Sequence, residues 1–158
     1  MICIDLEASG LSPDSYPIEI AWKCTRTGRS DTFLINPDSV PEWDYWDECA
    51  EELHGIEPEL LQQQGISAEA ACSRLNHALE GACVVSDAHA FDDFWLRRLF
   101  EACKVVPRFK LVGLETVLPP KQCERYEQIA RGQFRRHRAL QDVDDLIAAI
   151  EQARQTEA

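Results

Sequence analysis

The sequence predicts an α/β fold in which a mixed β-sheet is flanked by α-helices. Three segments with a two-residue apolar period stand at the start of the chain, and two further strand-like segments alternate with helical ones. Such an order is typical of a mixed sheet with helices packed against it. The length of 158 residues suits one domain, and we expect residues 1–158 to form it.

Alternation of apolar and polar residues predicts the first three strands. It begins in the segment 2–11, ICIDLEASGL, and recurs in 16–25 and 30–37. The turn residues of 25–30, TRTGRS, join the second segment to the third. We therefore expect the three strands to pair as a meander.

Helices and strands alternate in the rest of the chain. A serine cap and a closing glycine predict a helix within 67–81, and a buried strand at 82–87 leads directly into a helix over 91–105. The other expected elements are two short helices or mixed loops at 42–55 and 57–65, a fifth strand at 110–118, a helix from 119 to about 130, a basic loop from 132, and a closing helix at 138–153.

Composition limits the function classes. The net charge of −12 disfavours tight coating of long duplex DNA, although residues 131–141 hold four arginines and no acid, which suits a phosphate ligand held partly by metal ions. Seven cysteines without a CxxC pair predict reduced thiols. No apolar run reaches about 18 residues, and no signal peptide precedes the first strand, so we expect a cytoplasmic protein without a membrane span.

Acidic residues occupy positions where apolar ones are expected. Asp5 and Glu7 share one face of the first strand, with their Cα atoms about 6.6 Å apart. In the helix expected over 91–105, steps of 100° per residue place Asp92 near the centre of the apolar face, whereas Asp93 lies off that face. Asp142 falls at the edge of the apolar stripe of the closing helix. Buried anions this close repel one another unless protons or a cation intervene.

A bound cation explains these four acids together. A helix cap or an ion pair accounts for one of them, and Asp92 does lie near a helix start. A hard divalent cation accounts for all four, because Mg²⁺ and Mn²⁺ prefer carboxylate oxygen and water. We therefore predict a Mg²⁺ or Mn²⁺ site formed by Asp5, Glu7, Asp92 and Asp142.

Three motifs resemble those of the DEDD exonucleases and occur in that family's order. DLEASGL at 5–11 resembles the first motif, and AFDDFWL at 90–96 resembles the second and aligns Asp92 with its metal-binding aspartate. HRALQD at 137–142 resembles the His-x-Ala-x-x-Asp motif of the DEDDh subtype. The chain departs from the family at Ala88, where many members have asparagine.

The resemblance implies a ribonuclease-H-like fold and a stand-alone 3′–5′ exonuclease that acts on 3′ ends of single-stranded DNA or short RNA. The products would be nucleoside 5′-monophosphates. The implied catalytic set is two Mg²⁺ or Mn²⁺ ions on Asp5, Glu7, Asp92 and Asp142, with His137 as the general base. Alternatively, His137 is an exposed residue of a basic loop and has no catalytic role.

The candidates for substrate binding come from two parts of the chain. The first-motif loop of the family contacts the terminal nucleotide, and a histidine after it is either a further contact or a helix-end residue. The basic loop either holds phosphates or is simply solvated, and Gly132 would let it move as a lid. The candidates are Ser9, Leu11, His54, Arg135, Arg136 and Arg138.

Two other functions remain compatible with the sequence. One is oligoribonuclease-like clearance of very short RNA, and the other is a catalytically silent nucleic-acid-binding module. The protein is expected to be a monomer or a homodimer. The segment 41–48, PEWDYWDE, is either an exposed partner patch or a loop folded on its own core, and we favour the loop.

Overall fold

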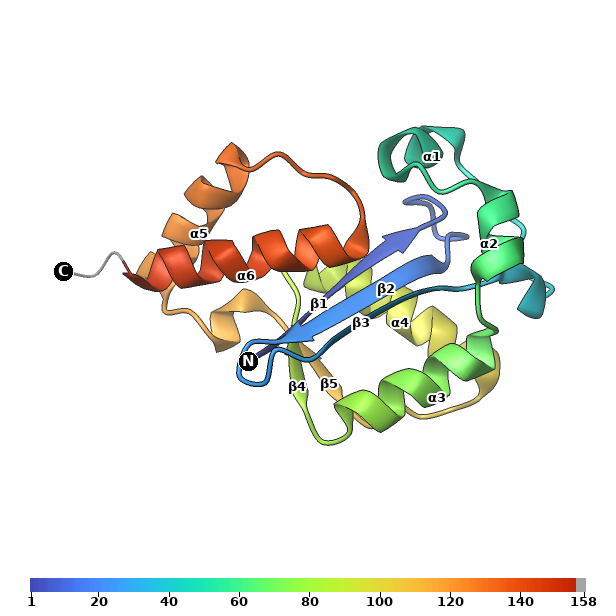
Figure 1. Cartoon of the computed structure of the whole chain (residues 1–158), viewed down its shortest axis with the longest axis horizontal. Coiled ribbons are helices and arrows are strands. Elements are labelled where there is room, and N and C mark those ends of the chain that lie inside the picture. The colour runs from blue at the N-terminus through green and yellow to red at the C-terminus, as the bar shows by residue number, and fades with distance from the viewer. Residues whose placement is uncertain (156–158) are drawn as a thin grey trace.

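The computed structural model describes residues 1–155 and arranges them in three layers (Figure 1). Within that range a five-stranded sheet has the order β3-β2-β1-β4-β5. The antiparallel meander β1-β2-β3 is as predicted, and β4 and β5 add parallel to it. The strands are β1 (Ile2–Ala8), β2 (Pro17–Cys24), β3 (Ser30–Leu34), β4 (Cys83–Val85) and β5 (Lys110–Val112).

Six α-helices and two one-turn 3₁₀ helices complete these described residues. They are α1 (Glu48–His54), α2 (Pro58–Gln64), α3 (Ala68–Leu79), α4 (His89–Cys103), α5 (Pro120–Gly132), α6 (Ala139–Gln155), η1 (Pro37–Ser39) and η2 (Leu114–Thr116). The mixed sheet with flanking helices confirms the predicted fold class.

The boundaries of several elements differ from the prediction. The expected strand at 110–118 is wrong beyond Val112, because its partner β4 offers only three residues and the chain then turns into η2. Within 42–55 the helix begins only at Glu48, where the Asp47 side chain accepts a hydrogen bond from the Cys49 N–H and caps α1. Helix α4 begins two residues before the predicted segment.

The central strand β1 contributes to a core on each side of the sheet. Ile4 and Leu6 face one core, which α3 and α4 cover, and Cys3 faces the other, which α5 and α6 cover. Figure 1 shows α6 lying along the sheet, with α3 and α4 on the other side. Asp5 and Glu7 follow Cys3 on the α6 side, opposite Ala21 and Glu19 of β2.

The segment 41–48 folds against its own chain, as favoured above. Trp43 is buried and stacks on Tyr16, with ring centroids 5.1 Å apart. Trp46 donates a hydrogen bond to Glu51 Oε1 at 2.8 Å. All seven cysteines are free thiols. No helix in residues 1–155 is both long enough and apolar enough to cross a membrane.

Candidate metal centre

The four acids singled out from the sequence are all buried and lie close to one another. Their residues are 3% (Asp5), 9% (Glu7), 1% (Asp92) and 7% (Asp142) exposed. The pKa of Asp5 is raised well above its usual value, first by burial and then by the charges of Asp92, Glu7 and Asp142. Carboxylates from β1, α4 and α6 therefore share one electrostatic environment.

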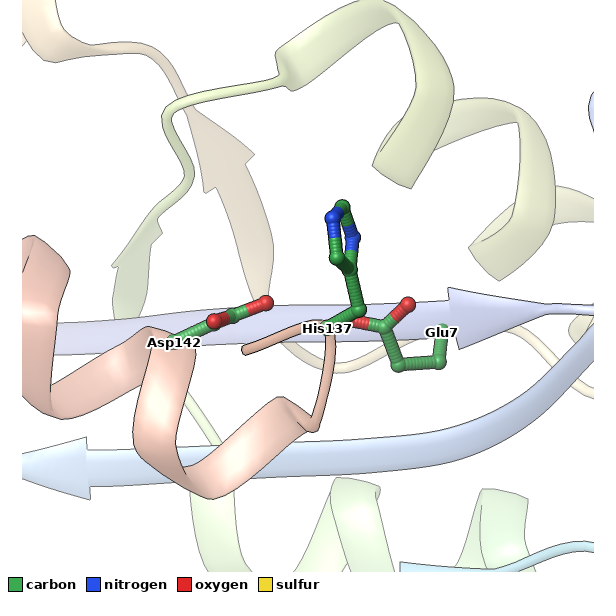
Figure 2. Close-up of side chains that lie close together, drawn as sticks. All are labelled: Glu7, His137 and Asp142. Carbon is green, nitrogen blue, oxygen red and sulfur yellow. The ribbon is translucent and has the colours of Figure 1, made fainter. Parts of the chain in front are cut away.

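Glu7 and Asp142 lie beside the histidine of the third motif. One ring nitrogen of His137 and one carboxylate oxygen of each acid all lie within 4.8 Å of one another. Figure 2 shows the three side chains on β1, on the loop that leads into α6, and on the first turn of α6. The arrangement brings a potential proton acceptor next to potential metal ligands.

Asp92 is held by a serine rather than by the start of its helix. Ser86 Oγ donates a hydrogen bond to Asp92 Oδ2 at 2.5 Å and accepts one from the Ala88 N–H at 3.0 Å. Ala88, the N-cap of α4, makes no side-chain cap hydrogen bond. The neighbouring Asp93 instead pairs with Arg97 at 2.7 Å on the surface. The alternative of Asp92 as a simple helix cap therefore lacks support.

Several carboxylate oxygens in this cluster have no hydrogen-bond partner among residues 1–155. They are Asp5 Oδ2, Glu7 Oε1, Asp142 Oδ1 and Asp142 Oδ2. A buried carboxylate oxygen without a partner is costly unless a proton or a cation satisfies it. The donor set is all oxygen with one imidazole nearby, which suits Mg²⁺ or Mn²⁺. These residues thus fit a divalent cation.

Protons stabilise this cluster when no cation is bound. Burial, followed by the charge of Asp142, raises the pKa of Glu7 to about 8. Burial raises the pKa of Asp92 to about 7, against the opposing effect of the Ser86 hydrogen bond. A divalent cation that binds here at neutral pH has to replace such protons.

One arginine of the basic loop reaches into the acidic cluster. Arg135 Nη2 lies 3.5 Å from Asp5 Oδ1, its Nε lies 3.5 Å from Asp142 Oδ2, and its Nη1 lies 4.0 Å from Asp87 Oδ2. The Arg135 side chain is 49% exposed. One guanidinium offsets only part of the charge of these acids, so it competes with a cation for them without neutralising each one.

The other two arginines of the loop have different surroundings. Arg138 forms a two-pronged ion pair with Glu19 on β2, and the shortest contact is 2.7 Å from Nη2 to Glu19 Oε2. Arg136 is exposed, and within residues 1–155 it makes no ion pair. The loop therefore presents one guanidinium to the acids, one to the sheet and one to solvent.

A cleft of about 480 Å³ opens beside the carboxylates. Leu11 and His54 line it, and Leu11 is 71% exposed. The remaining apolar side chains of its walls, which the sequence did not single out, include Leu53, Phe91 and Trp95. The cleft is thus lined both by exposed apolar side chains and by the buried carboxylates Asp5, Glu7 and Asp92.

Ser9 and His54 both have structural roles in this region. Ser9 is fully buried, and its Oγ accepts a hydrogen bond from the Tyr16 N–H at 3.2 Å, which closes the loop after β1. His54 Nδ1 accepts from the Ile56 N–H at 2.9 Å at the end of α1, and burial lowers the pKa of His54. His54 Nε2 has no hydrogen-bond partner in residues 1–155.

Sequence reasoning missed three polar residues of the site. Ser86 holds Asp92, Asp87 adds an acid that Tyr126 Oη contacts at 3.1 Å, and Glu19 binds Arg138. Glu19 alternates with Ile18 and Ile20 along its strand, but it is a single acid on its face and lacks the paired carboxylates that drew attention to Asp5 and Glu7.

Comparison with known proteins shows likeness at the level of the fold. No protein-family model and no curated protein matches the sequence. Structures of exonuclease I match nearly the whole chain. The zinc-bound complex of the E. coli enzyme with single-stranded DNA has a TM-score of 0.74 and 19% identity, and the match covers 99% of this chain and 41% of that one.

Two further structures of exonuclease I agree. The complex of the E. coli enzyme with a dT13 oligonucleotide has a TM-score of 0.77 at 17% identity, over 98% of this chain and 40% of that one. The apo enzyme has a TM-score of 0.75 at 20% identity, over 98% and 42%. The chain thus spans about two fifths of the length of exonuclease I. The likeness supports the expected ribonuclease-H-like fold.

Proposed function

We propose that residues 1–158 act as one cytoplasmic exonuclease domain of the DEDDh type, which hydrolyses single-stranded DNA or short RNA from the 3′ end. The observation that carries this proposal is the convergence of four buried carboxylates from β1, α4 and α6 with one histidine from the loop before α6. The fold of exonuclease I supports it, since structures of that enzyme include complexes with single-stranded oligonucleotides.

In this proposal the four carboxylates hold two Mg²⁺ or Mn²⁺ ions. Bound there, the ions would supply positive charge for the scissile phosphate and lower the pKa of the attacking water. The unpaired oxygens of Asp5, Glu7 and Asp142 are the ligands available for this purpose. Asp92 contributes from the start of α4, with Ser86 fixing its carboxylate.

His137 serves as the general base. Its ring lies within reach of the space between Glu7 and Asp142, where a water held by the site would be positioned. A neutral imidazole has a free ring nitrogen that can take the proton of that water. The leaving group is the 3′ oxygen of the preceding nucleotide, and the product is a nucleoside 5′-monophosphate.

The cleft beside the carboxylates receives the terminal nucleotide. Exposed Leu11, with Leu53 and Phe91, offers apolar surface to a base, and His54 lies on the same wall. Buried Ser9 shapes the loop that carries Leu11. Arg136 contacts substrate phosphates, and Arg135 does so once a cation has taken its place among the acids.

The test uses 5′-labelled single-stranded DNA and RNA oligonucleotides of several lengths with Mn²⁺. The parent is expected to shorten them stepwise from the 3′ end, and chelation of the metal is expected to stop the reaction. Asp92→Asn should abolish activity, whereas the matched Asp93→Asn should retain it, because Asp93 lies on the surface in a pair with Arg97.

Other outcomes would identify the alternatives. Activity confined to the shortest RNA would favour oligoribonuclease-like clearance. Binding of oligonucleotides by the parent, without any shortening, would refute the nuclease and favour a silent binding module. Equal activity of the parent and Asp92→Asn would show that the hydrolysis does not arise at this site.

A further inference from the structure

Glu19 lies next to the metal centre but makes bonds of a different kind. It stands on β2 directly across from Glu7 of β1, so both side chains are on the face covered by α6. Glu19 is only 4% exposed. Like charges directly opposite each other destabilise a strand pair. A buried Glu19 directly across from Glu7 therefore needs a partner that compensates its negative charge.

Both oxygens of Glu19 accept hydrogen bonds from Arg138 and from the first residue of α6. Arg138 Nε lies 3.1 Å from Oε1 and 3.2 Å from Oε2, and Arg138 Nη2 lies 2.7 Å from Oε2. The Ala139 N–H donates to Oε1 at 2.7 Å. Ala139 is the first residue of α6, where a carboxylate also interacts favourably with the helix dipole. We call Glu19, Arg138 and Ala139 the β2–α6 clamp.

The clamp lies between the two functional residues of the third motif. His137 immediately precedes it and has a φ of 57°, a left-handed backbone conformation that a side chain disfavours. Asp142 follows it in the first turn of α6, where the Asp142 N–H donates to the Arg138 carbonyl at 2.9 Å. Fixing Arg138 and Ala139 to the sheet thus fixes the residues on both sides of them.

We propose that Glu19 is a positioning residue of the metal centre. Through the β2–α6 clamp it holds His137 in its left-handed conformation and sets Asp142 opposite Glu7. Glu19 itself uses its oxygens for Arg138 and Ala139, whereas the oxygens of Asp142 and Oε1 of Glu7 have no hydrogen-bond partner among residues 1–155. The proposal rests on the proposed function of that site.

The chain contains a matched ion pair away from the site. Arg74 of α3 forms a two-pronged pair with Asp31 of β3, at 2.7 Å from Nε to Oδ2 and 2.6 Å from Nη2 to Oδ1. This pair also joins a helix to a strand of the same sheet. Asp31→Asn therefore reports what the loss of such an anchor does to stability alone.

The experiment compares Glu19→Gln, Arg138→Gln, the double variant and Asp31→Asn. For each we would measure Mn²⁺ affinity by calorimetry, kcat and KM on an oligonucleotide, the thermal midpoint, and hydrogen exchange of the Ala139 amide. Glu19→Gln should lower Mn²⁺ affinity and kcat about 10- to 100-fold, as loss of a group that orients metal ligands does. KM should change less than about threefold, because Glu19 does not contact the substrate.

Arg138→Gln separates positioning from simple electrostatics. Removing a positive charge near the acids would by itself strengthen Mn²⁺ binding, whereas loss of the clamp weakens it. We expect weakening, with faster exchange of the Ala139 amide. The double variant should be no worse than the more affected single variant, because both changes break one unit. Asp31→Asn should leave Mn²⁺ affinity and kcat unchanged.

The outcomes distinguish this proposal from the proposed function. Hydrolysis by the parent with unchanged Mn²⁺ affinity and kcat in Glu19→Gln would overturn the positioning role alone. Tighter Mn²⁺ binding by Arg138→Gln would do the same. A parent that binds Mn²⁺ without hydrolysis would refute the nuclease, and the Mn²⁺ affinities would still decide the role of Glu19. A parent that binds no Mn²⁺ would overturn both.

Discussion

Replacement of Arg135 by glutamine should strengthen the binding of divalent cations. The guanidinium lies 3.5 Å from a carboxylate oxygen of Asp5 and 3.5 Å from one of Asp142, which are two of the proposed metal ligands. A cation that binds there has to displace this positive charge. The parent therefore loses the energy of two ion pairs on binding, and the variant does not.

The magnitude follows from the exposure of the groups. Exposed ion pairs contribute about 0.2–1 kcal/mol each, and these two belong at the upper end because the carboxylates are buried. Solvent screens the guanidinium, which is 49% exposed, so the total stays near about 1–2 kcal/mol. Since about 1.4 kcal/mol is tenfold in affinity, Arg135→Gln should bind Mn²⁺ about 5- to 30-fold more tightly.

Calorimetric titration of Mn²⁺ at constant ionic strength measures this effect directly. Arg136→Gln is the matched control, because it removes the same charge one residue away, from a side chain exposed to solvent. Its affinity should stay within about twofold of the parent, as expected for a screened surface charge. If Arg135→Gln bound Mn²⁺ no more tightly than Arg136→Gln, competition between Arg135 and the cation would be refuted.

Three further predictions concern catalysis, pH and packing. His137→Gln should lower kcat about 10²- to 10⁴-fold in steady-state assays, as loss of a general base does, and a smaller loss would contradict that role. Without metal, the thermal midpoint should decrease as the pH is raised from about 5 to about 8. The reason is that Glu7 and Asp92 have pKa values in the folded state above those in the unfolded chain, so the folded state loses stabilising protons over this range. Added Mn²⁺ should reverse the fall at about pH 8, and a midpoint rising with pH would contradict the sign. In denaturant titrations Leu99→Ala, in the α4 core, should cost about 2–5 kcal/mol, whereas exposed Leu11→Ala should cost less than about 0.5 kcal/mol while raising KM; equal costs would be inconsistent with their burial.

Periodicity located the buried acids because each stands on a regular element. Asp5 and Glu7 drew attention as two carboxylates on one strand face, and Asp92 and Asp142 as acids within or beside apolar helix stripes. Glu19 obeys the same rule but is a lone acid on its face, which is the usual pattern of a strand exposed on one side. Only the packing of α6 over that face turns it into a buried residue.

Tertiary structure decides what the pattern leaves open. Arg135, Arg136 and Arg138 stand on a loop without periodicity, so nothing local distinguishes the one that enters the acidic cluster from the one that pairs with Glu19. The length of β5 depended in the same way on another element. Its apolar residues run on to Leu118, but the strand ends at Val112 because β4 provides no further partner.

The location of Asp5 and Glu7 on the central strand has a consequence for motion. Strand β1 pairs with β2 along its whole length and with β4 at its start, and it packs against helices on both faces. Opening it would disrupt both cores, so its amides should exchange with solvent only when the whole molecule unfolds. The acids on β1 therefore form a rigid part of the candidate site, and under the proposed function the arginine-bearing connection between α5 and α6 is the part that would adapt to a nucleic-acid substrate.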